Sequence, residues 1–119
     1  MSTCQIKRVY EPAANSDGYR ILIDRLWPRG LSKEKAHVDK WLKEVAPSTD
    51  LRKWFNHEPE KWASFCTRYR GELRGSAAFA ELVNDMHTHK TVTLLFGARD
   101  KEHNDAVALE EFIREQGGR

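Results

Sequence analysis

The hydrophobic pattern along the chain first indicates three β-strands. Residues 6–10 form a short apolar segment that ends near Pro12, which cannot donate a hydrogen bond to a sheet. Residues 19–26 follow a turn and contain Ile21–Ile23, a continuous apolar run typical of a strand buried on both faces. Residues 91–96 form another apolar, β-branched run. The pattern therefore predicts one short strand and two well-marked ones.

Between and after these strands, apolar residues recur at the spacing of amphipathic helices. Each apolar group follows a residue suited to a helix start. These starting residues are Ser32, Ser48 or Thr49, Pro59, Ser76, and Asn104 or Asp105. The apolar faces are Val38, Trp41, Leu42 and Val45; Leu51, Trp54 and Phe55; Trp62, Phe65, Cys66, Tyr69 and Leu73; Phe79, Leu82, Val83 and Met86; and Leu109, Phe112 and Ile113. Pro47, Gly75 and Gly117-Gly118 are placed to end helices.

The resulting order is two strands, four helices, a strand and a helix. This order predicts an α/β fold, a small three-layer sandwich in which helices cover a mostly parallel sheet. About eight residues separate the first two strands, fewer than the dozen or so that a parallel crossover needs. The spacing alone therefore favours an antiparallel hairpin for that pair.

Length, composition and charge narrow the class of protein. The 119 residues suit one domain, 1–119, and 39% hydrophobic with 32% charged residues excludes a disordered tail. No apolar run is long enough to span a membrane, and the first residues have no signal-peptide pattern, so we expect a cytoplasmic protein without a membrane partner. Cys4 and Cys66 form neither a disulfide framework nor a zinc ligand set. A net charge of +2 does not by itself require nucleic-acid binding.

Candidate chemistry lies in two loops that follow strands. In an open α/β sheet, ligands bind beyond the carboxyl ends of the strands. The segments 24–32 and 97–104 occupy such positions. We expect an anion-binding pocket there, formed by Arg25, Arg29, Gly30, Ser32 and Arg99.

Proton transfer is the second chemistry that these loops suggest. Asp24, Asp100 and His103 are the candidate acids and bases, because histidine titrates near neutral pH and carboxylates act as bases. The alternative interpretation is structural: Asp24 and Asp100 pair with neighbouring arginines, and Trp27 belongs to the core. The sequence contains no Walker loop, dinucleotide fingerprint or Cys-x-x-Cys pair, so no cofactor and no metal is predicted.

Two other constellations have a simpler structural interpretation. His57 lies beside Glu58 and Glu60, which resembles the acidic first turn of a helix more than a metal site. Arginines flank Tyr69 on the predicted helix after Pro59, a pattern that suits a nucleic-acid backbone. Acidic residues lie among them, which favours a solvated helix face. The residues concerned are Lys61, Arg68, Arg70 and Arg74, with Glu60, Glu72 and Glu81 among them.

Several motifs together resemble one known family over nearly the whole chain. They are Arg8-Val9-Tyr10-Glu11-Pro12, Asp17-Gly18, the run from Ile23 to Ser32, Val45-Ala46-Pro47-Ser48, Leu51-Arg52, Trp54-Phe55 with His57, and Asn104-Asp105-Ala106-Val107. The chain resembles the YeaO-like branch of the family called domain of unknown function 488.

The resemblance carries expectations about fold and chemistry. Asp24, Arg25 and Pro28 resemble a family cluster after the second strand, and the resemblance implies a parallel first pair of strands in a Rossmann-like sheet. The helix between those strands would be reduced to residues 11–18. Other branches carry a Cys-His-Arg triplet where this chain has Glu102-His103-Asn104, so a thiol mechanism does not transfer, although His103 remains.

The sequence thus predicts an uncharacterised domain with an anion pocket, either as an enzyme on a phosphorylated or nucleotide-like small molecule or as a binding protein. Its catalytic candidates are Asp24 and His103, with Trp27, His57, Asp100 and Asn104 in supporting positions. The alternative function is a non-catalytic module that binds nucleic acid or protein. The ligand and the oligomeric state are left open.

Overall fold

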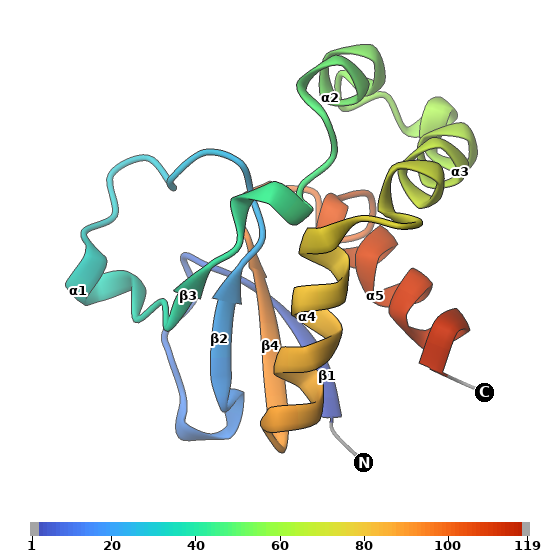
Figure 1. Cartoon of the computed structure of the whole chain (residues 1–119). Helices are drawn as coiled ribbons and strands as arrows, with labels where there is room; N and C mark the ends of the chain where they lie inside the picture. Colours follow the sequence, from blue (N-terminus) through green and yellow to red (C-terminus); the bar gives the residue numbers. More distant parts are fainter. Residues whose placement is uncertain (1–2, 118–119) are drawn as a thin grey trace.

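The computed structural model describes residues 3–117, which form a parallel sheet with helices around it (Figure 1). The strands are β1 (Thr3–Arg8), β2 (Tyr19–Leu22), β3 (Lys40–Trp41) and β4 (Thr91–Phe96). The α-helices are α1 (Lys33–Ala36), α2 (Thr49–Phe55), α3 (Trp62–Leu73), α4 (Ala77–Thr88) and α5 (Asp105–Gly117). Single 3₁₀ turns are η1 (Asn15–Asp17), η2 (Lys43–Val45) and η3 (Pro59–Lys61). The predicted α/β class is confirmed. The predicted end of the last helix is Gly117-Gly118, of which Gly118 lies outside the described residues.

The strand order in the sheet is β1-β4-β2-β3, and every neighbouring pair is parallel. The predicted hairpin between the first two strands is therefore wrong. β4 lies between β1 and β2, with Ile6 and Ile21 both in register with Leu94. The short connection crosses this intervening strand through η1, so it never has to make a tight hairpin turn. The parallel orientation implied by the family resemblance is confirmed.

The two faces of the sheet are covered to different extents. One face carries Ile21, Val92 and Leu94 and packs against α3, α4 and α5 in the larger core. The other face carries Leu22 and Leu95, which α1 and the loop before it cover. The three layers are thus unequal, and the thicker side includes the helices of the second half of the chain (Figure 1). Within residues 3–117, no helix has the length and apolarity needed to cross a membrane.

The prediction of one long helix after Ser32 is wrong. α1 has four residues and ends at His37, whose φ of 49° is left-handed. The chain then pairs with the free edge of β2, since Leu42 N donates to Leu22 O at 2.9 Å. Trp41, predicted to point inward, is 38% exposed on β3. Hydrogen bonding to the edge of β2 therefore determines the structure of this segment, although its apolar residues have helical spacing.

The predicted helix caps are confirmed where the structure can show them. The hydroxyl oxygens of Ser32, Ser48 and Ser76 accept hydrogen bonds from the backbone N–H three residues later. Asn104 Oδ1 accepts one from Val107 N at 3.0 Å. These caps set the starting points of α1, α2, α4 and α5.

A buried polar cluster occupies the thinner side of the sheet. Asp17 and Arg20 are 5% and 4% exposed and pair with each other, and Lys7 Nζ lies 3.0 Å from Asp17 Oδ2. Although burial by itself raises the pKa of Asp17, hydrogen bonds from Ala14 N, Lys7 and Arg20 hold it below its ordinary value. The next residue, Gly18, has φ of 65° and a Cβ there would lie 2.4 Å from Thr91 O, so glycine is required. The cluster holds the β1–β2 connection against β4.

Replacing Asp17 with asparagine should destabilise the protein strongly. The substitution leaves the Arg20 charge buried without its partner, and removing one member of a buried ion pair costs about 3–5 kcal/mol. Urea denaturation at neutral pH measures this loss. Arg114→Gln is the matched control, because Arg114 is 71% exposed in its pair with Glu110 and such pairs contribute about 0–1 kcal/mol. Equal effects of the two substitutions would contradict a structural role for the buried cluster.

Candidate functional site

The two loops singled out by the sequence meet at the carboxyl edge of the sheet. β2 and β4 are neighbours, so the segments that follow them lie side by side. Asp24 Oδ2 accepts a hydrogen bond from Gly97 N at 2.8 Å. A Cβ on Gly97 would lie 3.2 Å from that oxygen, tighter than most contacts of this kind. The close approach of a carboxylate to the end of β4 is therefore suited to glycine.

Asp24 also forms a carboxyl pair with Asp105. The two side chains hydrogen-bond to each other, and Asp105 is the first residue of α5. Burial raises the pKa of Asp105 well above its ordinary value, and the neighbouring charge and hydrogen bond of Asp24 raise it further. Two adjacent carboxyl groups that hydrogen-bond to each other hold one proton between them. The sequence analysis treated Asp105 only as a possible helix cap and missed this pairing.

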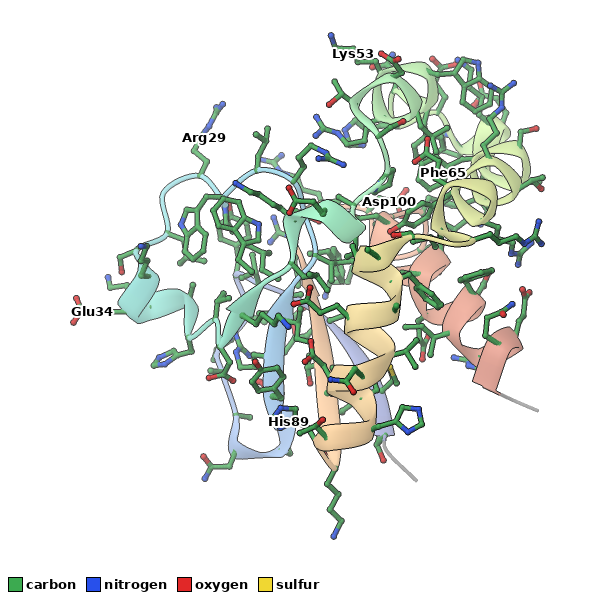
Figure 2. All side chains as sticks on the ribbon, viewed as in Figure 1. Arg29, Glu34, Lys53, Phe65, His89 and Asp100 are labelled. Carbon is green, nitrogen blue, oxygen red and sulfur yellow. The ribbon has the colours of Figure 1, made fainter. Side chains whose placement is uncertain are left out.

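The carboxyl pair lies in a cleft of about 400 Å³. Its lining combines the loops after β2 and β4 with α2, α3 and the start of α5. Stacked rings of Phe55 and Phe65, with centroids 4.5 Å apart, supply the apolar part of the lining. Figure 2 shows Phe65 on the side of α3 that faces α2. The polar or charged lining residues are Asp24, Arg25, Arg52, Lys53, Asn56, His57, His103, Asn104 and Asp105.

Arg25 is the cation most firmly held in this cleft. Its Nη2 donates to the carbonyl oxygens of Ala46 at 3.3 Å and Pro47 at 3.5 Å. Within residues 3–117, Arg25 Nε is buried and has no hydrogen-bond partner. Arg52 and Lys53 line the same cleft from α2, and the Lys53 side chain extends outward from that helix (Figure 2). Arg25 therefore lines the cleft and has one donor that no described group uses.

Tyr69 fixes the segment that holds Arg25. Its hydroxyl donates to Val45 O at 2.6 Å, and its side chain is fully buried. Burial raises the pKa of Tyr69 well above its ordinary value, and Asp105 and Asp24 raise it further while Arg25 opposes them. Tyr69 and Arg25 therefore both hydrogen-bond to the backbone of residues 45–47.

His103 and Asp100 form a second polar pair beside the cleft. His103 Nδ1 lies 3.0 Å from Asp100 Oδ2, and its ring meets Trp62 edge-on at 5.3 Å between centroids. Hydrogen bonds from Glu102 N and His103 lower the pKa of Asp100. Asn104 joins this loop to α5, since its Nδ2 donates to Asp100 O at 2.9 Å. Of this group, His103 and Asn104 line the cleft.

The backbone at the end of α2 has an unusual conformation. Asn56 and His57 have φ of 49° and 55°, in the left-handed region that non-glycine residues rarely adopt. Both residues line the cleft. Because such conformations cost energy and are concentrated at functional sites, their position supports the choice of this cleft.

The structure separates the remaining predicted residues from the cleft. Arg29 and Arg99 are exposed and do not line it, and Figure 2 shows Arg29 extending from the loop before α1. Gly30 has φ of 76° in open space and Ser32 caps α1. Trp27 packs in the core of the thinner side and donates to Leu31 O at 2.6 Å. The chain leaves the sheet edge after residue 26 to cover that side, which carries these residues away.

The other constellations have structural roles. Tyr69 is buried, so it cannot stack on a base beside the arginines of α3. Arg70 pairs with Glu115 at 2.7 Å, and the Arg68 guanidinium lies 4.2 Å from the Trp54 ring centroid. In the part of the chain that the structure describes, no three histidine, cysteine or acidic residues are grouped to hold a metal ion.

Replacing Asp105 with asparagine should change how stability depends on pH. Above the ordinary pKa of 3.8, the unfolded chain loses the Asp105 proton while the folded protein keeps it, so the free energy of unfolding falls as pH rises. The variant lacks this titration. Its stability relative to the original protein should therefore increase from about pH 4 to about pH 7.

Thermal denaturation of both proteins across this pH range measures the difference. Asp100→Asn is the control: the pKa of Asp100 is lowered from 3.8, so its contribution to stability is lost only below that pH, and the difference between this variant and the original protein should stay nearly constant across the measured range. A pH-independent difference between the original protein and Asp105→Asn would mean that the carboxyl pair does not retain a proton.

Comparison with known proteins identifies the family. A family model described as "Inactive DUF488-N3 subclade" matches residues 3–119. Uncharacterized protein YeaO of Escherichia coli (strain K12) is 44% identical over 110 residues, which cover 92% of this chain and 96% of YeaO. Uncharacterized protein Rv3073c of Mycobacterium tuberculosis is 39% identical over 109 residues, 92% of each chain. No solved structure gives a significant match. The chain therefore belongs to the family of this model, "Inactive DUF488-N3 subclade", and the resemblance to the YeaO-like branch of domain of unknown function 488 is confirmed.

Proposed function

We propose that this protein binds a small anion, such as a phosphate or carboxylate group, in the cleft at the carboxyl edge of the sheet. The observation that carries the proposal is the position of Arg25. Its guanidinium is anchored by two carbonyl oxygens while its buried Nε lacks a partner. A buried donor without a partner is costly, and an anion that accepts its hydrogen bond removes that cost.

The charge balance of the cleft supports an anionic ligand. Arg25, Arg52 and Lys53 contribute three positive charges to the lining. Asp24 and Asp105 contribute one negative charge between them, because they share a proton. The lining therefore has a net positive charge, and partial burial strengthens its attraction for an anion.

Binding without chemical conversion fits the observations better than catalysis. The family model that the chain matches carries the description "inactive". His103 has its Nδ1 paired with Asp100, which orients the ring and leaves Nε2 to hydrogen-bond a ligand. We therefore assign Asp24 and His103 to ligand recognition in this proposal.

Two further properties belong to the proposal. Residues 1–119 act as one domain, and the protein works in the cytoplasm, where unpaired thiols persist. Cys4 and Cys66 are free, and burial raises their pKa values to about 12 and about 11. Thiols with such pKa values are poor nucleophiles, which agrees with a binding role.

Inorganic phosphate should raise the melting temperature in a concentration-dependent manner, because a ligand that binds only the folded state stabilises it. The measurement is thermal denaturation in sodium phosphate against sodium chloride of equal ionic strength. Arg52→Gln should weaken phosphate binding by about tenfold or more, since a hydrogen bond to a charged group contributes about 1.5–3 kcal/mol. Arg25→Gln should have the same effect.

Arg29→Gln is the matched control, because Arg29 is exposed and does not line the cleft. It should leave phosphate binding unchanged. Arg52 lies on the exposed surface of α2, so its variant reports on binding even if Arg25→Gln proves unstable. The absence of a phosphate effect at tens of millimolar, or an equal loss in Arg29→Gln, would overturn the proposed anion site.

A further inference from the structure

The carboxyl pair in the cleft restricts the chemistry of the ligand beyond its anionic group. Ionised carboxylates only accept hydrogen bonds, so the hydrogen bond between Asp24 and Asp105 requires a proton on one of them. Asp24 Oδ2 also accepts from Gly97 N. The proton lies between the two carboxyl groups, so the pair presents its remaining oxygens to the cleft as acceptors, with one negative charge.

A bare anion matches only the cationic part of this lining. Phosphate beside Arg25 and Arg52 is attracted, but phosphate beside the carboxyl pair is repelled by its charge. A ligand that fills the cleft must place a different group against Asp24 and Asp105. That group has to donate hydrogen bonds to carboxylate oxygens.

An ammonium group is disfavoured at this position. Arg25 lies close enough to the pair for all three residues to influence Tyr69, and Arg52 lines the same cleft. A second cation among these groups meets like-charge repulsion in a partly buried environment. Hydroxyl groups have no charge, and each one both donates and accepts a hydrogen bond. Their O–H groups donate to the acceptor oxygens that the pair presents.

The size and apolar lining of the cleft agree with a compact, hydroxyl-rich molecule. A volume of about 400 Å³ lies near the lower end of the range of about 300–1,000 Å³ found for small-molecule sites. The stacked rings of Phe55 and Phe65 offer an apolar surface to the C–H groups of a carbon skeleton. The anionic group, the hydroxyls and the carbon skeleton thus each have a matching part of the lining.

We propose that the ligand is a phosphorylated sugar or polyol, with its phosphate on Arg25 and Arg52 and its hydroxyl groups on the Asp24–Asp105 pair. This inference rests on the proposed anion site and names the class of compound that the site takes. Phosphate provides attraction through charge, and the hydroxyl groups provide selectivity.

Calorimetric titration with phosphate esters that differ in hydroxyl content tests the inference. Ethyl phosphate is the reference, because it carries the phosphate group without hydroxyls. Ribose 5-phosphate, glucose 6-phosphate and glycerol 3-phosphate are the hydroxyl-bearing probes. At least one of the three should bind about tenfold or more tightly than ethyl phosphate, as one or two additional hydrogen bonds to a charged group allow.

Asp105→Ala is the decisive variant. The readout is the ratio of the two affinities measured in this variant, because ethyl phosphate carries no hydroxyl group for the pair to bind. The preference for the hydroxyl-bearing ester should fall to about threefold or less. Arg29→Gln, outside the cleft, should retain the full preference.

The outcomes separate this inference from the proposed function. Binding of ethyl phosphate with no preference for any of the three hydroxyl-bearing esters would overturn the sugar or polyol ligand and keep the anion site. A preference that persists in Asp105→Ala would overturn the role of the pair. Failure of every phosphate ester and of inorganic phosphate to bind would overturn the anion site itself.

Discussion

The hydrogen bond from the Gly97 N–H to the Asp24 carboxylate is the constraint on which the candidate site depends. It joins the segments after β2 and β4, which are about seventy residues apart in sequence but neighbours in the sheet. The Asp24 backbone carbonyl also accepts from Trp41 Nε1 at 2.7 Å, so β3 is tied to the same residue. With the Asp24 carboxyl fixed in this way, the start of α5 brings Asp105 against it. One residue therefore connects the ends of three strands to the helix that completes the carboxyl pair.

Local patterns predicted the elements whose stability is mainly local or fully buried. β4 spans residues 91–96 as expected, and α3 and α4 bury the apolar stripes read from the sequence, including Phe65 and Leu82. The helix predicted for residues 38–45 is wrong because the apolar spacing of this segment suits both a helix and an edge strand. The edge of β2 decides between them, and the spacing of Trp41 and Leu42 carries no information about that edge. The predicted hairpin between β1 and β2 is wrong for a related reason. β4 lies between these strands in the sheet but comes much later in the sequence, and local spacing does not report such a long-range contact.

For the candidate site too, local and strand-end rules predicted some residues, and tertiary packing decided the others. The rule that ligands bind beyond the carboxyl ends of parallel strands selected two loops that the structure brings together, and Asp24, Arg25 and His103 line one cleft. The rule does not predict the path of a loop beyond the sheet edge. The loop after β2 turns away from the cleft and carries Arg29 with it. Arg52 was missed because it lies on the exposed side of α2. It reaches the cleft only through the packing of α2 on α3, in which Phe55 stacks on Phe65, and no local pattern around residue 52 reports that packing.

The presence of two acids in a cleft suited to an anion follows from their proximity to each other. Two carboxylates in a partly buried site cannot both ionise at low energetic cost, so the Asp24–Asp105 pair carries one charge instead of two. That proton lies in the hydrogen bond within the pair, so the pair offers its remaining oxygens as acceptors. Arg25 and Arg52 then outweigh the remaining negative charge, and the cleft keeps a positive field while offering polar groups that a simple basic patch lacks. Charge attraction alone would accept many anions. Under the proposed function, the pairing of Asp105 with Asp24 supplies the selectivity, because a ligand that matches both the guanidinium groups and the carboxyl pair satisfies more of the polar groups in the cleft.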